Sequence, residues 1–157
     1  MNALGEAVGE LCKIVLPIRE EFFLGNPGSQ IAICTLSSID LLRKLRDSPV
    51  LSKVSVVGRL LSENKGIDSL LDRVYRSRIT TILVCGRDVQ GHRAGHSLFQ
   101  LHSHGLDSRR RIVNSASPDP YITATISSVA HFRSNVRLID MIDETDPERI
   151  CQRVRIL

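Results

Sequence analysis

Short apolar runs alternate along this chain with stretches in which apolar residues recur every three or four positions. Four of the runs are brief and rich in β-branched residues, which is typical of strands covered on both faces. These runs lie at 30–35, 54–57, 79–85 and 136–142. The helical spacing is clearest over 66–75. Such alternation predicts an α/β domain with a mostly parallel sheet and helices on both faces, a Rossmann-like three-layer arrangement.

Three more helices are expected from apolar spacing and from capping residues. One follows Ser37 and Ser38, either of which can cap it. A second lies within 92–103, after the third strand. The last opens at 145–148, where the residues have capping-box spacing and a proline falls in the first turn.

Domain organisation follows from the turn residues at 25–29, which separate two unequal parts. Residues 1–24 are expected to form an N-terminal helical extension, because apolar residues recur at helical spacing as far as Pro17. Residues 25–157 then form a single domain, which is the size that a chain of 157 residues allows.

Composition narrows the class of protein. Hydrophobic residues make up 42% and charged residues 24%, which is usual for a globular protein. Apolar stretches of about five residues are far shorter than the ~20 of a membrane span, and the start of the chain does not resemble a secretory signal. Four scattered cysteines without a CxxC pair indicate thiols in a reducing compartment. We therefore expect a cytoplasmic protein without a direct membrane span.

The charge balance indicates a surface tolerant of anionic ligands. The formal net charge is only +4, which does not by itself point to a nucleic-acid partner. Aromatic residues make up 4%, there is no tryptophan, and no known RNA- or DNA-binding motif accompanies the arginines. We therefore expect no nucleic-acid partner.

Ligands of parallel α/β domains bind where strands end at their carboxyl edge. The loops after Thr35 and Cys85 are therefore expected to form the binding site. The second loop, residues 85–96, holds three glycines within ten residues and two histidines. Its glycine spacing does not match GxGxxG, and no Gly-Lys-Ser/Thr follows, so a dinucleotide or triphosphate site is disfavoured.

Three interpretations of His92 and His96 stay open on the residues alone. The two side chains can be solvated groups at a strand-to-helix turn. They can share an ion such as zinc with a third ligand from the loop, for example Asp88. Alternatively, one histidine can hold a metal that brings its own equatorial ligands, because a tetrapyrrole metal needs only an axial base. If the helix begins near Gly91, the two histidines lie on one face beside Gly95, which is expected to leave room for a large ligand, and the opposite face packs into the core.

Five segments resemble, in consistent order, the corrinoid-carrying A subunit of the tetrahydromethanopterin S-methyltransferase complex of methanogenic archaea. They are GNPGS with the strand IAICTL, SENKGI at 62–67, ILVCGRDVQGHRAG at 82–95, LHSHGLD at 101–107 and VRLIDMID at 136–143. The resemblance covers roughly residues 20–150.

The resemblance implies a Rossmann-type domain that binds cobalamin or a related corrinoid, with His92 as the lower axial ligand of cobalt. It implies that the chain carries a methyl group from methyl-tetrahydromethanopterin to coenzyme M, while methyltransferase partner proteins supply the donor and acceptor. In the family's membrane complex this transfer is linked to sodium export. The residues expected to contact the cofactor besides His92 are Gly91, Gly86, Asp88, Gln90, Gly95, Thr35, Leu36, His96 and Tyr121.

Ligation requires the neutral imidazole, so we expect binding to weaken in acid. The second ring nitrogen needs a partner that orients it, and Asp88 and Gln90 are candidates.

The chain departs from the family pattern at several places. His96 stands where glutamine is usual, Ser37 stands where glycine is common, and residues 114–121 lack the family's glycines. The sequence ends at Leu157 without the family's C-terminal tail and anchor, so a free-standing soluble homologue is expected, without sodium pumping of its own. The alternative is a non-catalytic homologue that acts as a corrinoid store or sensor, or as a partner-binding module.

Other chemistry-bearing residues have simpler interpretations. The run Arg109–Arg111 is expected to be a solvated loop, with contact to a phosphate or a propionamide-rich cofactor edge as the alternative. Cys85 is expected in the core, and Asp140 and Asp143 at a strand end are expected to be structural. His131 is expected on a helix surface.

Overall fold

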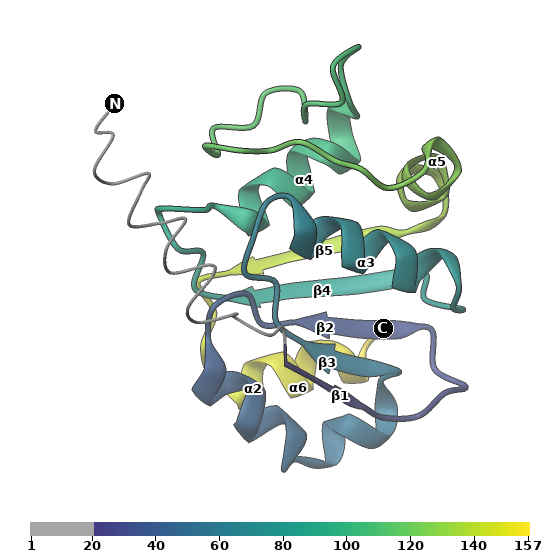
Figure 1. Ribbon diagram of the computed structural model, residues 1–157. Helices are drawn as coiled ribbons and strands as arrows, with labels where there is room; N and C mark the ends of the chain where they lie inside the picture. Colours follow the sequence, from purple (N-terminus) through teal and green to yellow (C-terminus); the bar gives the residue numbers. More distant parts are fainter. Residues whose placement is uncertain (1–20) are drawn as a thin grey trace.

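A computed structural model describes residues 21–157 of the protein, and Figure 1 shows a central sheet between two layers of helices. The strand order is β1-β3-β2-β4-β5. All neighbours pair in parallel except β1, which runs antiparallel to β3. The strands are β1 (Phe22–Leu24), β2 (Ile31–Cys34), β3 (Val56–Gly58), β4 (Thr81–Gly86) and β5 (Arg137–Ile142). The prediction of an α/β fold with a mostly parallel sheet is confirmed, whereas the finer Rossmann-like assignment stays a prediction.

The helices divide between the two faces of the sheet (Figure 1). One face is covered by α3 (Lys65–Tyr75), α4 (Ala94–His104) and α5 (Ile126–Asn135). The other is covered by α2 (Ile39–Arg46) and α6 (Pro147–Arg155), with the 3-10 helix η1 (Pro49–Lys53) beside them.

Strand β4 lies inside the sheet, and all six of its residues are buried. Its side chains alternate between the two cores, as a strand covered on both faces requires. Ile82 and Val84 pack under α3, α4 and α5, whereas Leu83 and Cys85 pack on the α2 and α6 side. Both layers of helices are therefore held against this one strand.

Two elements differ from the sequence prediction because their hydrogen bonds come from distant parts of the chain. Strand β3 begins at Val56 rather than Val54, since the carbonyls of Val54 and Ser55 accept from Asn26 and Gly25 in the preceding turn. Strand β1 was not predicted, and it occupies the last residues of the expected extension. The rest of that extension, residues 1–20, lies outside the described residues.

The caps of the helices also differ in detail. Ser38 occupies the N-cap of α2, but its hydroxyl accepts from the backbone N–H of Arg87 and makes no cap bond. Asp146 rather than Thr145 caps α6, accepting from Glu148 at 2.9 Å, and Pro147 follows as expected. Ser38 thus stands at an expected cap position but bonds to another loop, and the cap of α6 lies one residue after Thr145. The helices themselves lie close to where their apolar spacing predicts.

Over residues 21–157, no helix combines the length and the apolar character that crossing a membrane requires. In the same part of the chain no disulfide is formed: Cys34 and Cys85 are buried and Cys151 is half-buried. The expected core position of Cys85 is confirmed, and Cys12 lies outside the described residues.

The buried position of β4 generates a prediction for stability. Leu83 is fully buried in this strand, so Leu83→Ala is expected to lower the free energy of unfolding by about 2–5 kcal/mol through lost apolar contacts and a residual cavity. Urea unfolding followed by circular dichroism measures the change. The matched control is Ile156→Ala, because that side chain is 72% exposed and its loss is expected to cost less than about 0.5 kcal/mol. Equal effects of the two substitutions would contradict this assignment of the core.

The buried thiol of Cys85 generates a second prediction. Burial raises the pKa of this thiol well above its ordinary value of 9.0. The folded protein therefore keeps a proton that the unfolded chain loses above that pH, and stability is expected to fall as pH rises past it. The urea midpoint should fall less between neutral and alkaline pH in Cys85→Ala than in the parent. An identical alkaline decline in both proteins would show that this thiol does not contribute.

Candidate functional site

The loops that follow β2, β3 and β4 meet at the carboxyl edge of the sheet, because these strands are parallel neighbours. The loops after β2 and β4 approach so closely that Gly86 cannot carry a side chain. A Cβ there would lie 2.3 Å from the carbonyl oxygen of Thr35, and the residue has φ +76°. Glycine is the residue that adopts this conformation without strain. Gly86 therefore fixes the distance between the two loops.

Two serines join the same loops by hydrogen bonds. Ser37 donates to the carbonyl of Arg87 from both its backbone N–H and its hydroxyl, at 3.2 and 2.6 Å. The hydroxyl of Ser38 accepts from the N–H of Arg87 at 2.9 Å. Ser37 and Ser38 thus hold the neighbouring loop in place.

Asp88 caps helix α4. Its two carboxylate oxygens accept from the backbone N–H groups of Gly95 and His96 at 3.0 and 2.8 Å. The helix begins only at Ala94, after Arg93 with φ 49°, so His92 stands before the helix and not on its first turn. Capping a first turn in this way stabilises the helix and fixes where it starts.

Gly95 provides space for this cap. A Cβ at that position would lie 3.0 Å from a methyl carbon of Leu36 and 3.1 Å from a carboxylate oxygen of Asp88. The open face expected beside the histidines is therefore filled by the protein's own side chains at Gly95.

His92 is tied to a buried carboxylate that the sequence did not single out. Its Nδ1 lies 3.0 Å from Oε2 of Glu63, in the loop between β3 and α3. The Glu63 side chain is 2% exposed, whereas the His92 side chain is 48% exposed. The other oxygen of Glu63 accepts from the N–H of Asp119 at 3.1 Å. The orienting partner of the ring is thus Glu63 and not Asp88 or Gln90, the two candidates expected from sequence proximity.

This pairing has a chemical consequence for the ring. A neutral imidazole that donates Nδ1–H to a carboxylate keeps its lone pair on Nε2, which is the arrangement found in metal-binding histidines. The half-exposed ring follows Gly91, where an added Cβ would meet nothing within 4 Å. The arrangement therefore offers a single, oriented nitrogen donor on a half-exposed side chain.

His96 has a different role from that of His92. Its Nε2 accepts from the backbone N–H of Ala116 at 3.2 Å, which joins α4 to the segment at 112–122. The buried hydroxyl of Ser97 strengthens the same join, lying 2.7 and 2.6 Å from the hydroxyls of Ser115 and Ser117. The glycine-poor segment at 114–121 is thus anchored through its serines.

The remaining residues expected to contact a cofactor divide by exposure. Thr35 and Leu36 are fully buried and present no accessible surface to a ligand. Direct contact of either residue with a cofactor stays a prediction. Gln90 is exposed. Tyr121 is exposed and lies with its ring centroid 5.8 Å from the guanidinium carbon of Arg111.

A shared metal ion at His92, His96 and Asp88 receives no support from these contacts. Among residues 21–157, no group of three or more His, Cys, Asp and Glu side chains is placed to hold a metal ion. Each of the three side chains instead has its own partner in a different part of the fold.

The place of Glu63 in the sequence could have marked it as a candidate site residue. It follows the predicted strand at 54–57 and precedes the helix at 66–75, so it belongs to a third loop at the same carboxyl edge. Its pairing with His92 spans 29 residues along the chain, and no local pattern encodes that distance.

The cap of α4 generates a prediction that separates structural from ligand-binding roles. Asp88→Ala is expected to lower the free energy of unfolding by about 1 kcal/mol, because two N–H groups of the first helical turn lose their acceptor. Asp72→Ala is the control, since its 58% exposed side chain makes only a surface ion pair and should cost less than about 0.5 kcal/mol. Urea unfolding distinguishes the two, and equal costs would refute the capping role.

Comparison with known proteins gives consistent matches over most of the chain. The family model described as the A subunit of tetrahydromethanopterin S-methyltransferase matches residues 14–157. The chain is 36% identical over 136 residues to the A subunit of the "Putative methyltransferase Mtx" of Methanosarcina acetivorans, which covers 85% of this chain and 65% of that protein. It is 33% identical over 137 residues to A subunit number 2 of tetrahydromethanopterin S-methyltransferase from Methanothermobacter marburgensis, covering 85% of this chain and 71% of that relative.

A further relative is A subunit number 1 of tetrahydromethanopterin S-methyltransferase from Methanothermobacter thermautotrophicus, 28% identical over 141 residues. That match covers 88% of this chain and 57% of the relative, so the chain spans little more than half of the longer protein. The family model matches nearly the whole chain, including every loop at the carboxyl edge described above. The chain therefore belongs to the family of tetrahydromethanopterin S-methyltransferase A subunits.

Proposed function

We propose that this protein is a methyl carrier that binds cobalamin or a related corrinoid, with His92 as the lower axial ligand of cobalt. The observation that carries the proposal is the His92–Glu63 pair, in which a buried carboxylate orients a half-exposed imidazole at the carboxyl edge of the sheet. Membership of the family supports the same cofactor class.

The chemistry of the donor set fits such a group. A corrinoid brings its own equatorial nitrogens, so the protein needs to supply one axial nitrogen and not a cluster of ligands. His92 would supply one through Nε2, while the carboxylate of Glu63 accepts a hydrogen bond from Nδ1–H and so fixes the tautomer. The His92 side chain is 48% exposed, so an approaching group can reach the ring.

The His92 ring and the start of helix α4 are held by different side chains. When bound, the corrinoid would supply a cobalt centre that accepts a methyl group and passes it on. His92 lies in a turn, where its backbone N–H donates to Val89 at 3.1 Å. Helix α4 is capped independently by Asp88, so the start of the helix does not depend on what His92 binds.

The substrates and partners belong to the same proposal. By analogy with the family, the methyl group would come from methyl-tetrahydromethanopterin and go to coenzyme M, with partner methyltransferase proteins supplying both reactants. The proposed compartment is a reducing cytoplasm, where a thiol such as that of Cys85 stays reduced.

The test is an absorption titration of the purified protein with hydroxocobalamin. The parent should bind saturably with a shift in the corrin spectrum, and His92→Ala should lose at least about tenfold in affinity together with that shift. Glu63→Gln should retain binding but weaken it by about tenfold, because second partners of ligating histidines contribute 10–100-fold. His96→Ala and His104→Ala are the matched controls and should keep the spectral shift of the parent.

Two outcomes would contradict the proposal. An unchanged bound spectrum in His92→Ala would remove His92 as the ligand. Absence of binding by the parent would favour the alternative, a homologue of the family that acts through partner proteins and has lost the cofactor.

A further inference from the structure

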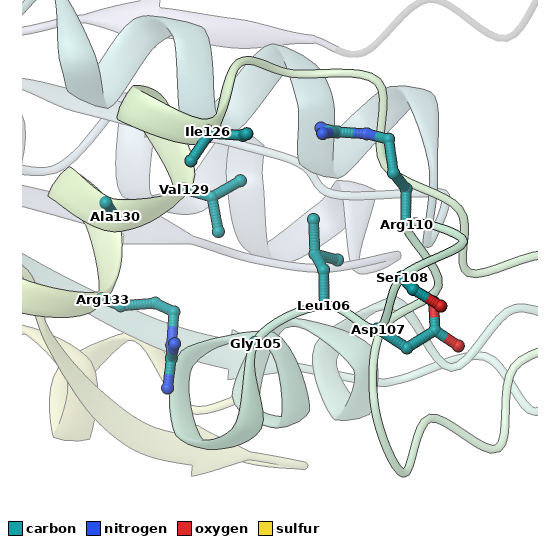
Figure 2. A pocket seen from close by; sticks show the side chains of 9 residues that line it. All are labelled: Gly105, Leu106, Asp107, Ser108, Arg110, Ile126, Val129, Ala130 and Arg133. Carbon is teal, nitrogen blue, oxygen red and sulfur yellow. The ribbon is translucent and has the colours of Figure 1, made fainter.

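A hollow of about 370 Å³ lies between α5 and the segment that follows α4 (Figure 2). It lies at the other end of the domain from His92. Helix α4 begins just after the His92 turn and has 11 residues, so its far end is roughly 15 Å away. The lining residues are Gly105, Leu106, Asp107, Ser108, Arg110, Ile126, Val129, Ala130 and Arg133.

The floor of the hollow is apolar. Leu106 and Val129 face each other in its centre, with Ile126 beside them (Figure 2). Leu106 and Val129 also join the core under α4 and α5, which fixes them in place. Ile126, in contrast, is 78% exposed. The apolar floor therefore continues onto an exposed isoleucine at its rim.

Two arginines stand at opposite sides of this floor in Figure 2. Arg110 donates to the carbonyl of Ile122 at 2.7 Å and to that of Ala124. Arg133 donates to the carbonyls of His102 and Ser103, at 3.1 and 3.2 Å. Each guanidinium has five N–H donors, so these bonds fix the group and leave further donors for an anion.

Gly105 allows Arg133 to take this position. A Cβ at Gly105, which has φ +74°, would lie 2.8 Å from Nη1 of Arg133. The guanidinium therefore lies directly against the backbone of Gly105. A cation that is already held in place loses little side-chain entropy when it meets a carboxylate.

The carboxylate of Asp107, which also lines the hollow, is hydrogen-bonded within its own loop. Oδ1 of Asp107 accepts from the backbone N–H groups of Arg109 and Arg111, both at 2.9 Å. The run 109–111 is thus not a uniformly solvated loop: Arg109 is exposed, whereas Arg110 and Arg111 are half-buried and bonded to backbone carbonyls. The two cations of the lining, Arg110 and Arg133, thus lie on opposite sides of the apolar floor, while the Asp107 carboxylate is bonded to its own loop.

We propose that this hollow docks a segment of a partner protein that presents an apolar side chain flanked by carboxylates. The apolar floor would take the side chain, and Arg110 and Arg133 would take the carboxylates, as arginine commonly does at protein interfaces. A small-molecule site usually encloses most of its ligand, whereas α5 and the segment at 105–110 form only two walls and leave Ile126 open. The apolar centre likewise disfavours a nucleic-acid backbone.

Docking at this place has a consequence for a carrier protein. A partner held here would leave the carboxyl edge of the sheet, where His92 lies, accessible to the reacting groups. The proposal does not depend on a bound corrinoid, so its test is independent of the cofactor titration.

The probes are two peptides, N-acetyl-Glu-Leu-Leu-Glu-amide and N-acetyl-Lys-Leu-Leu-Lys-amide, added to the full chain with labelled methyl groups. The acidic peptide is expected to shift the methyl resonances of Leu106, Ile126 and Val129 saturably, and the basic peptide is expected to leave them unchanged. Ile126→Ala and Arg133→Gln should each weaken binding about fivefold, as loss of an interface anchor does.

Controls separate this surface from general effects. Ile156→Ala removes an isoleucine that is 72% exposed elsewhere, and Arg149→Gln removes an arginine that is 71% exposed; both should bind like the parent. His92→Ala should also bind like the parent. Equal binding of the two peptides, or resonances unmoved by either, would overturn the proposal. Hexanoate binding as tightly as the acidic peptide would overturn it in favour of a site for small organic acids.

Discussion

The carboxylate of Glu63 is the constraint on which the carboxyl edge depends. A charged group that is almost wholly buried is costly unless hydrogen bonds satisfy it, and here the donors come from two other parts of the chain. One is the His92 ring in the loop after β4, and the other is the backbone of Asp119. The loops that carry Glu63, His92 and Asp119 must therefore pack against one another, because neither donor alone satisfies both oxygens of the carboxylate. A neighbouring bond from Asn64 to Asp119 reinforces the junction.

Around this junction the two histidines of the loop have separated in function. The His92 ring is half-exposed, and its Nδ1 is held by the buried carboxylate of Glu63. His96 lies on the helix and accepts from Ala116, so its position is set by the protein itself. Residues only four apart in the sequence are thus held by different partners, and the helix that Asp88 caps begins between them.

Sequence patterns predicted the helices and strands whose apolar residues recur at a regular spacing. The buried strands and the helices α2, α3, α4 and α6 lie close to their expected positions, and the helix expected around His131 is α5. Strand β1 and η1 were not predicted, because segments of three and five residues are too short to show a period. Such elements are defined by what they pack against.

The site was harder to predict, because the roles of its residues depend on distant partners. Asp88 was expected to orient a histidine or bind an ion, yet its oxygens meet the N–H groups of α4. Gly95 was expected to leave room for a ligand, and Leu36 and Asp88 occupy that room. Glu63 was passed over, since nothing near it in the sequence marks a bond to His92. Residue type indicated the kind of chemistry, whereas the pairing required the fold.

The short edge strand β1 has a consequence for how the molecules behave towards one another at high concentration. An edge strand offers unpaired backbone groups on which another chain can extend the sheet. Here β1 is only three residues long and runs antiparallel to its neighbour, and Phe22 in it carries the guanidinium of Arg73 at 4.1 Å above its ring. The opposite edge, β5, presents the exposed charges of Arg137 and Asp140. Both borders therefore discourage the lateral growth of sheets from one molecule to the next, and so oppose aggregation.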